Sequence, residues 1–307
     1  MSSSRKAISS EVPNNHVLGL LYHLHTVYLF SRDNIKDIIC IGFVFGTLNS
    51  LVAPLFSMGP PLSFNRVPFA SYKMLLWSWS NLFLFNLHNQ RHPSSISEDV
   101  LNKPWRPIPA GRITSAQATR LMYLMYPITL LISLEVGGLG PCILEAFCCL
   151  WYNEWGGAAN PFLKNLLNGL GFAWFLSGPF EVATGHSILA GNDKAVIWVA
   201  ILTYFRDMDG DRAAGRNTVP LVIGDKVARI VVLLGVAGWT GAACWYWEVS
   251  WIESLIPWAS GGLMVGNLFY NRSREGDSFS WKLFPAWLLS LFLLPVISGW
   301  NGGNMED

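Results

Sequence analysis

Long apolar runs alternate with short polar segments through most of the chain. A helix needs about 20 mostly apolar residues to cross a bilayer, and nine runs reach or approach that length. They are residues 35–57, 69–88, 118–136, 139–155, 165–188, 194–206, 227–247, 254–271 and 281–299. The pattern predicts an all-α, polytopic membrane protein with nine transmembrane helices, although the runs 139–155 and 194–206 are short.

The two ends of the chain differ from this pattern. Residues 1–16 are polar, lack the apolar stretch of a cleavable signal peptide and are expected to be disordered. Residues 17–30 are apolar but too short for a span, which predicts an interfacial or buried helix. No linker or shift in composition divides residues 17–300, so we expect a single transmembrane domain followed by a short tail at 301–307.

The composition supports a membrane protein. Of the 307 residues, 51% are hydrophobic and 13% are charged, whereas a soluble domain has about 25% charged residues. The net charge of +1, with no basic patch between aromatic residues, argues against a nucleic-acid partner and leaves the lipid bilayer as the expected surroundings. The five cysteines lie in apolar runs without metal-binding spacing and are expected to be small buried side chains.

Basic residues are distributed unevenly between the two sides of the predicted membrane. With the N-terminus in the cytoplasm, Arg66, Lys73 and Lys194 are the Lys and Arg residues on the opposite side, and the remainder of the 21 are cytoplasmic. This positive-inside bias supports the nine spans. It also places the two polar stretches described next on the same, cytoplasmic side. For such a multispanning protein we expect the endoplasmic reticulum.

The first polar stretch covers residues 86–114 and follows an apolar run. Asn86, Gln90, Ser94 and Glu98 recur every fourth residue, so on one helix they would share a face. Their oxygen atoms are the kind of ligand that Mg²⁺ accepts. Pro93 opposes a regular helix, because it removes a backbone donor and is expected to kink the segment.

Charged residues follow, and a second polar stretch also combines acidic side chains with basic neighbours. Lys103 and Arg106 are cations suited to phosphate and lie just beyond Glu98 and Asp99. In residues 206–220, RDMDGDRAAGRNTVP, two acidic side chains four apart share a helical face and have basic neighbours. The acidic pair is Asp207 and Asp211, and the basic neighbours include Arg206 and Arg212. Two such clusters are suited to a metal–diphosphate.

The two stretches together resemble the motifs of the UbiA superfamily of intramembrane prenyltransferases. That family's first motif reads N-D-x-x-D-x-x-x-D and is followed by R-P-x-P-x-G. Here Asn89 takes the leading Asn, and RPIPAGRIT at 106–114 fits the trailing part. The second stretch fits the family form D-x-x-x-D with G-D-R-x-x-G-R-x-T-x-P. The resemblance implies a UbiA-like fold, with the helices around a central cavity.

The departures from these motifs are informative. Gln90, Pro93 and Ser97 stand where the family has Asp, and carboxylates return only at Glu98 and Asp99. This form looks like the fungal branch of membrane-bound, UbiA-type terpene cyclases, which cyclise farnesyl diphosphate. In the second motif Tyr204 takes a position that usually carries Asp, so one expected metal ligand is missing.

The resemblance implies Mg²⁺-dependent class I chemistry, in which farnesyl diphosphate is ionised and cyclised to a sesquiterpene. The catalytic residues it implies are Glu98, Asp207 and Asp211, and the diphosphate-binding residues are Lys103, Arg106, Arg206 and Arg212. The implied metal ligands are Asn89, Gln90, Ser94, Glu98, Asp99, Asp207 and Asp211.

Two alternatives share these features. A UbiA-type prenyltransferase would use the same metal and phosphate residues to move a prenyl group to an aromatic or other acceptor. A non-catalytic transporter or scaffold, from a different class of protein, would use the polar helix ends as a gate. Only the form of the first motif favours the cyclase over the prenyltransferase.

Overall fold

The computed structural model describes residues 16–191, 193–203 and 224–301. These residues form helices and loops, and no strand occurs among them. The first part of the chain, up to the second polar stretch, contains α1 (His16–Ser31), η1 (Ile35–Cys40), α2 (Ile41–Ser50), η2 (Ala53–Phe56), η3 (Phe64–Arg66), α3 (Val67–Gln90), α4 (Pro93–Asn102), α5 (Ser115–Val136), α6 (Leu139–Asn153), η4 (Gly157–Ala159), α7 (Pro161–Thr184) and α8 (Asp193–Thr203). The last part contains α10 (Asp225–Tyr246), α11 (Trp251–Tyr270), α12 (Arg274–Phe292) and α13 (Leu294–Asn301).

The prediction of an all-α protein is confirmed for the described residues. A helix overlaps each of the nine apolar runs, and most bounds agree within a few residues. By length and hydropathy alone, three described helical segments could cross a membrane: Ser115–Val136, Asp225–Tyr246 and Arg274–Trp300. The count of nine transmembrane helices therefore stays a prediction.

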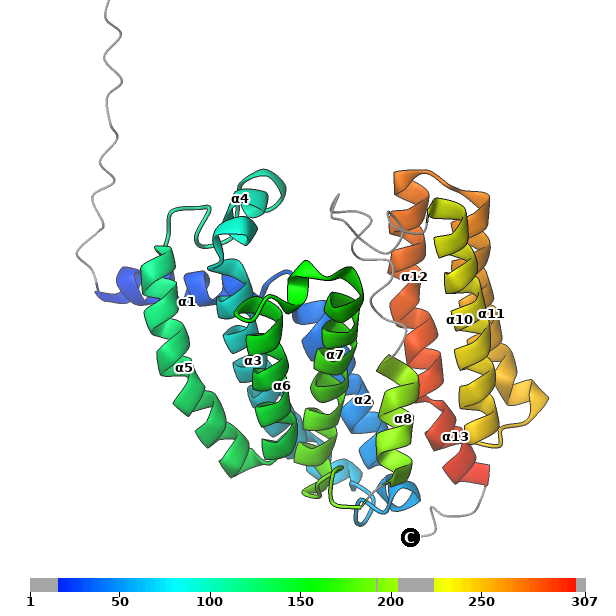
Figure 1. The fold of residues 1–307 in the computed structure, drawn as a ribbon. Coiled ribbons are helices and arrows are strands. Elements are labelled where there is room, and N and C mark those ends of the chain that lie inside the picture. Colours follow the sequence, from blue (N-terminus) through cyan, green and yellow to red (C-terminus); the bar gives the residue numbers. More distant parts are fainter. Residues whose placement is uncertain (1–15, 192, 204–223, 302–307) are drawn as a thin grey trace, which may run out of the picture.

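Helix α1 lies across one end of the bundle, whereas α3 and α5 run along it (Figure 1). Its side chains Leu20, Leu21 and Leu24 are more than half exposed. The loop between α4 and α5 attaches to it, because Arg112 stacks on the Tyr22 ring and donates to the Tyr22 carbonyl oxygen at 2.9 Å. This orientation and exposure favour the predicted interfacial helix.

Helix α7 holds the first part of the fold together. It packs against α2, α3, α6 and α8, while α10, α11 and α12 form a second group that reaches the rest through the contacts of α12 with α2 and of α10 with α8. Aromatic rings fill the centre: Phe45 of α2 lies against Phe180 of α7 and Phe292 of α12, with ring centroids 5.8 and 5.0 Å away. The core therefore joins helices from both ends of the sequence.

Two glycines allow α2 and α7 to approach closely. Gly42 and Gly46 are four residues apart on α2, and both face α7. A Cβ on Gly46 would lie 2.9 Å from Pro179 and 3.0 Å from the sulfur of Met74. Small residues at this spacing let helix backbones come together inside membranes.

We expect Gly46→Leu to destabilise the fold by on the order of 1–3 kcal/mol, the usual cost of an overpacked core. The midpoint of thermal unfolding in detergent should fall by several degrees. Gly266→Leu is the matched control, because a Cβ on this exposed α11 glycine meets nothing within 4 Å. An equal midpoint for the two variants would show that the α2–α7 crossing tolerates a side chain.

Candidate active site

A polar pocket of about 410 Å³ opens where α3 ends and where α7 begins. Its walls come from the C-terminal end of α3, from α4, from the end of α6 and from the turn that leads into α7. These segments gather at one end of the bundle (Figure 1). The lining residues are Asn89, His92, Ser94, Ser95, Glu98, Tyr152, Asn153, Glu154, Gly156, Ala158, Ala159 and Lys164. We call this set the polar pocket.

The polar pocket brings together three residues of the first motif, Asn89, Ser94 and Glu98. The prediction that Asn86, Gln90, Ser94 and Glu98 share one helical face is wrong, because α3 ends at Gln90 and α4 starts at Pro93. The residue between them before the proline, His92, is extended (φ −71°, ψ 136°). A residue before proline avoids helical geometry, and proline suits the first position of a new helix. Two helices, the end of α3 and α4, therefore carry the first motif and line the pocket.

Gln90 does not line the pocket. It is buried, and its amide nitrogen donates to the carbonyl oxygen of Phe30 at 2.8 Å. Its side chain thus ties the end of α3 to the end of α1. The structure gives Gln90 this structural contact, and its proposed role as a metal ligand has no support from the pocket.

Asp99, Lys103 and Arg106 form a separate ionic cluster beside the pocket. The Nη1 atom of Arg106 donates to the two carboxylate oxygens of Asp99 at 3.0 and 2.8 Å, and its Nε donates to Asp33 at 3.1 Å. Lys103 lies 3.7 Å from the same Asp33 carboxylate. None of these residues lines the polar pocket. In this arrangement the cluster fixes the loop after α4 onto the segment after α1.

The sequence reasoning did not find the contribution of α6 and α7. Lys164, in the first turns of α7, lines the pocket and is only 6% exposed. Glu154, at the end of α6, pairs with Arg91 and lies 3.0 Å from Nδ1 of the buried His88. The other ring nitrogen of His88 is 2.7 Å from the Tyr126 hydroxyl. In the sequence, Lys164 is marked as a pocket residue only by being a single lysine at the start of an apolar run.

A second, inner cavity of about 200 Å³ lies beside the pocket, and Tyr152 lines both. Most of its wall is apolar, with aromatic rings from α3, α7 and α12. The lining residues are Asn34, Ile38, Phe85, Glu145, Cys148, Cys149, Tyr152, Leu167, Asn168, Gly171, Phe172, Phe175 and Trp281. We call this set the inner cavity. Helices α6 and α7 therefore form a wall that runs from a polar mouth to an aromatic interior.

The second polar stretch falls outside the described residues. Arg206, Asp207, Asp209, Asp211 and Arg212 belong to it, and Tyr204, just before it, also lies outside the described residues. Their predicted roles therefore stay predictions.

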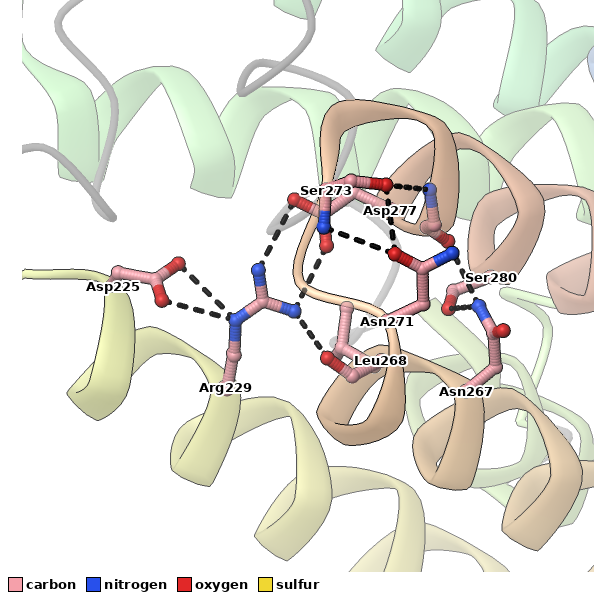
Figure 2. A network of polar contacts seen from close by, with 9 residues as sticks. Asp225, Arg229, Asn267, Leu268, Asn271, Ser273, Asp277 and Ser280 are labelled. Carbon is pink, nitrogen blue, oxygen red and sulfur yellow. Dashed lines mark hydrogen bonds and ion pairs between the residues drawn. The ribbon is translucent and has the colours of Figure 1, made fainter.

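The chain re-enters the described part at a buried polar cluster, shown in Figure 2. Arg229 of α10, only 1% exposed, contacts Asp225 at 3.1 Å, Asp277 at 2.8 Å and the carbonyl oxygen of Leu268. This cluster joins the start of α10, the end of α11 and the start of α12 at the same end of the bundle as α4 (Figure 1). The helix that follows the second motif is thus anchored at that end.

The donor atoms of the pocket suit Mg²⁺ in kind. Asn89, Ser94 and Glu98 offer an amide, a hydroxyl and a carboxylate oxygen, which are ligands of a hard cation. No group of three or more His, Cys, Asp or Glu able to hold a metal occurs within residues 16–191, 193–203 and 224–301. The described part therefore supplies a partial ligand set, to which the predicted ligands Asp207 and Asp211 would add.

The described residues thus form an all-helical bundle in which a polar pocket lies beside an aromatic cavity. The sequence profile of the UbiA prenyltransferase family matches residues 74–291. The chain therefore belongs to the UbiA prenyltransferase family, as its motifs predicted.

Individual relatives and structures agree with this membership. The chain is 28% identical over 287 residues to the fumagillin beta-trans-bergamotene synthase of Aspergillus fumigatus, covering 91% of this chain and 94% of the relative. It is 30% identical over 222 residues to a diterpene cyclase of Hericium erinaceus, covering 66% and 67%. A UbiA homologue from Archaeoglobus fulgidus bound to GPP and Mg²⁺ superposes with a TM-score of 0.55 at 14% identity, covering 89% of this chain and 99% of that one. The last comparison supports the fold.

Proposed function

We propose that this protein is an Mg²⁺-dependent class I terpene cyclase that ionises farnesyl diphosphate and cyclises it to a sesquiterpene. The observation that carries the proposal is that the polar pocket and the aromatic inner cavity share Tyr152 in their walls. A prenyl diphosphate has this polarity: a polyanionic head and a hydrocarbon tail. The similarity to a bergamotene synthase over nearly the full length of both chains favours a cyclase.

In this proposal Mg²⁺ neutralises the leaving diphosphate when bound. Glu98, Asn89 and Ser94 of the first motif would hold it, together with Asp207 and Asp211 of the second. Lys164 adds a buried positive charge in the same pocket. The predicted diphosphate contacts from Arg206 and Arg212 complete the cationic set. Lys103 and Arg106 would have to leave Asp33 and Asp99 to join them.

The inner cavity has the properties needed by a carbocation. The rings of Phe85, Phe172, Phe175 and Trp281 line it, and aromatic faces stabilise positive charge without attacking it. A largely apolar wall also keeps water away from the cation. The side chains of the protein therefore bind the diphosphate in the polar pocket. In the inner cavity they hold the hydrocarbon in shape and shield it from water.

We also propose that the nine predicted helices all span the membrane and that the polar pocket faces the cytoplasm of the endoplasmic reticulum. The basic loops of the predicted topology support this orientation. The exposed apolar α1, lying across the bundle end that carries the pocket, supports an interface at that level (Figure 1).

Membranes that contain the protein test the proposal directly. They are incubated with Mg²⁺ and, separately, with geranyl, farnesyl or geranylgeranyl diphosphate, and the headspace is analysed by gas chromatography with mass spectrometry. We expect a cyclic C15 hydrocarbon from farnesyl diphosphate, with equimolar diphosphate, that control membranes do not produce. Absence of any hydrocarbon from all three substrates would refute the cyclase.

The second candidate is a prenyltransferase, which the description of the family favours. It would release diphosphate only when an acceptor is supplied. Incubation with farnesyl diphosphate and a panel of phenolic acceptors separates the two enzymes. A transporter or scaffold would release diphosphate under neither condition.

A further inference from the structure

A carboxyl group with one unpaired oxygen is buried in the aromatic interior of the described part of the chain. Glu145 of α6 lines the inner cavity and is 4% exposed. Its Oε2 atom has no partner in the part of the chain that the structure describes. Burial of an unsatisfied polar group is costly, and an acidic residue within an apolar helix usually marks function.

A second buried glutamate shows what a structural role looks like in this fold. Glu181 of α7 is also 4% exposed, but its Oε1 accepts from the Ser187 hydroxyl at 3.1 Å and from the Ile188 backbone N–H at 2.7 Å. It therefore organises the turn after α7. Glu145 has no comparable contact with the described residues, so the stability of this part of the fold does not explain it.

The neighbouring helix leaves space for this carboxyl group. Gly171 of α7 lines the same cavity, and a Cβ at that position would lie 3.1 Å from Oε2 of Glu145. Any larger residue at 171 would press on the carboxyl group. The depth of Glu145 also matters: it lies seven residues before Tyr152 on α6, roughly 10 Å along the helix from the junction with the polar pocket.

We propose that Glu145 is a specificity-determining residue, whose carboxyl oxygen faces the carbocation in the inner cavity and fixes where its positive charge is held. The inference rests on the proposed cyclase function. The aromatic rings attract a cation from several sides at once. A carboxyl oxygen among these rings breaks that symmetry, because an oxygen lone pair interacts more strongly with the nearest cationic carbon. Removal of this oxygen should change the products more than the rate of ionisation.

The test compares Glu145→Leu, Glu145→Gln and the wild-type protein in membranes supplied with farnesyl diphosphate. For Glu145→Leu we expect diphosphate release within about threefold of wild type and a loss of at least half of the main product in favour of other terpenes. Glu145→Gln keeps an oxygen at this depth and should retain the main product. A wild-type product distribution from Glu145→Leu, or a loss of diphosphate release above tenfold, would overturn the inference.

Gly171→Ala provides an independent readout if Glu145→Leu does not accumulate. It keeps the carboxyl group but displaces Oε2, and it should shift the product distribution in the same direction. An unchanged distribution from this variant would count against the inference. Failure of the proposed function is distinguishable, since the wild-type protein itself would then form no hydrocarbon.

Discussion

Replacement of Glu98 by Gln is expected to lower diphosphate release from farnesyl diphosphate about 100-fold or more. Glu98 is the carboxylate of the first motif that lines the polar pocket, beside Asn89 and Ser94. Gln keeps the size and one oxygen but removes the negative charge that attracts a divalent cation most strongly. Loss of one group that stabilises developing charge typically costs 10²–10³ in rate. The variant should also need more Mg²⁺ to reach half of its residual rate.

Glu135→Gln is the matched control, because Glu135 is exposed on α5 and lies outside the polar pocket. It should keep the wild-type rate and the wild-type Mg²⁺ requirement. Protein abundance in the membranes and the thermal midpoint are measured for both variants. Full activity of Glu98→Gln at equal abundance would remove Glu98 from the metal site.

Hydropathy alone predicted the positions of most helices. The run 69–88 became α3 (Val67–Gln90), and the run 118–136 became α5 (Ser115–Val136), whose start is fixed by a capping box at Thr114. Apolar length works as a signal here because a helix satisfies its own backbone groups in an apolar medium. The pattern could not show that α1 lies across the bundle, since that depends on contacts such as Arg112 with Tyr22.

The sequence predicted only part of the candidate site, because a spacing argument holds only within one continuous helix. Asn89, Ser94 and Glu98 were recognised from motif and spacing, and the polar pocket does bring them together. Gln90 does not share a helical face with Ser94 and Glu98, because the extended His92 before Pro93 separates α3 from α4. A regular helical wheel assumes one continuous helix, and a proline inside the stretch removes that assumption.

Charges that act through tertiary contact were not predictable from the chain alone. Asp33 is an ordinary loop acid in the sequence, yet it binds Arg106 and Lys103 from the first motif. Lys164 and Glu145 are isolated charged residues in apolar runs. Only the packing of α6 against α7 places one at the mouth and the other in the interior. The place of each such charged residue in the site therefore depends on how the helix that carries it packs against its neighbours.

Replacement of Lys164 by Met is expected to lower kcat/KM for farnesyl diphosphate by about 10- to 100-fold. Lys164 is buried in the polar pocket with Glu98, where an ammonium group can donate to phosphate oxygens in a dry setting. A hydrogen bond to a charged group contributes about 1.5–3 kcal/mol, and a loss of that size corresponds to this range of rates. Met keeps the length and the apolar stem. Lys164→Arg keeps the charge and should recover part of the rate.

Inhibition by inorganic pyrophosphate separates binding of the head group from a role in folding. If Lys164 contacts the diphosphate, the inhibition constant for pyrophosphate should rise at least tenfold in Lys164→Met, while the thermal midpoint stays near that of wild type. Lys73→Met is the control, because Lys73 lies near the far end of α3 over the Phe69 ring. It should leave both constants unchanged. A lower kcat/KM with an unaltered inhibition constant would assign Lys164 to the architecture of the pocket instead of to the diphosphate.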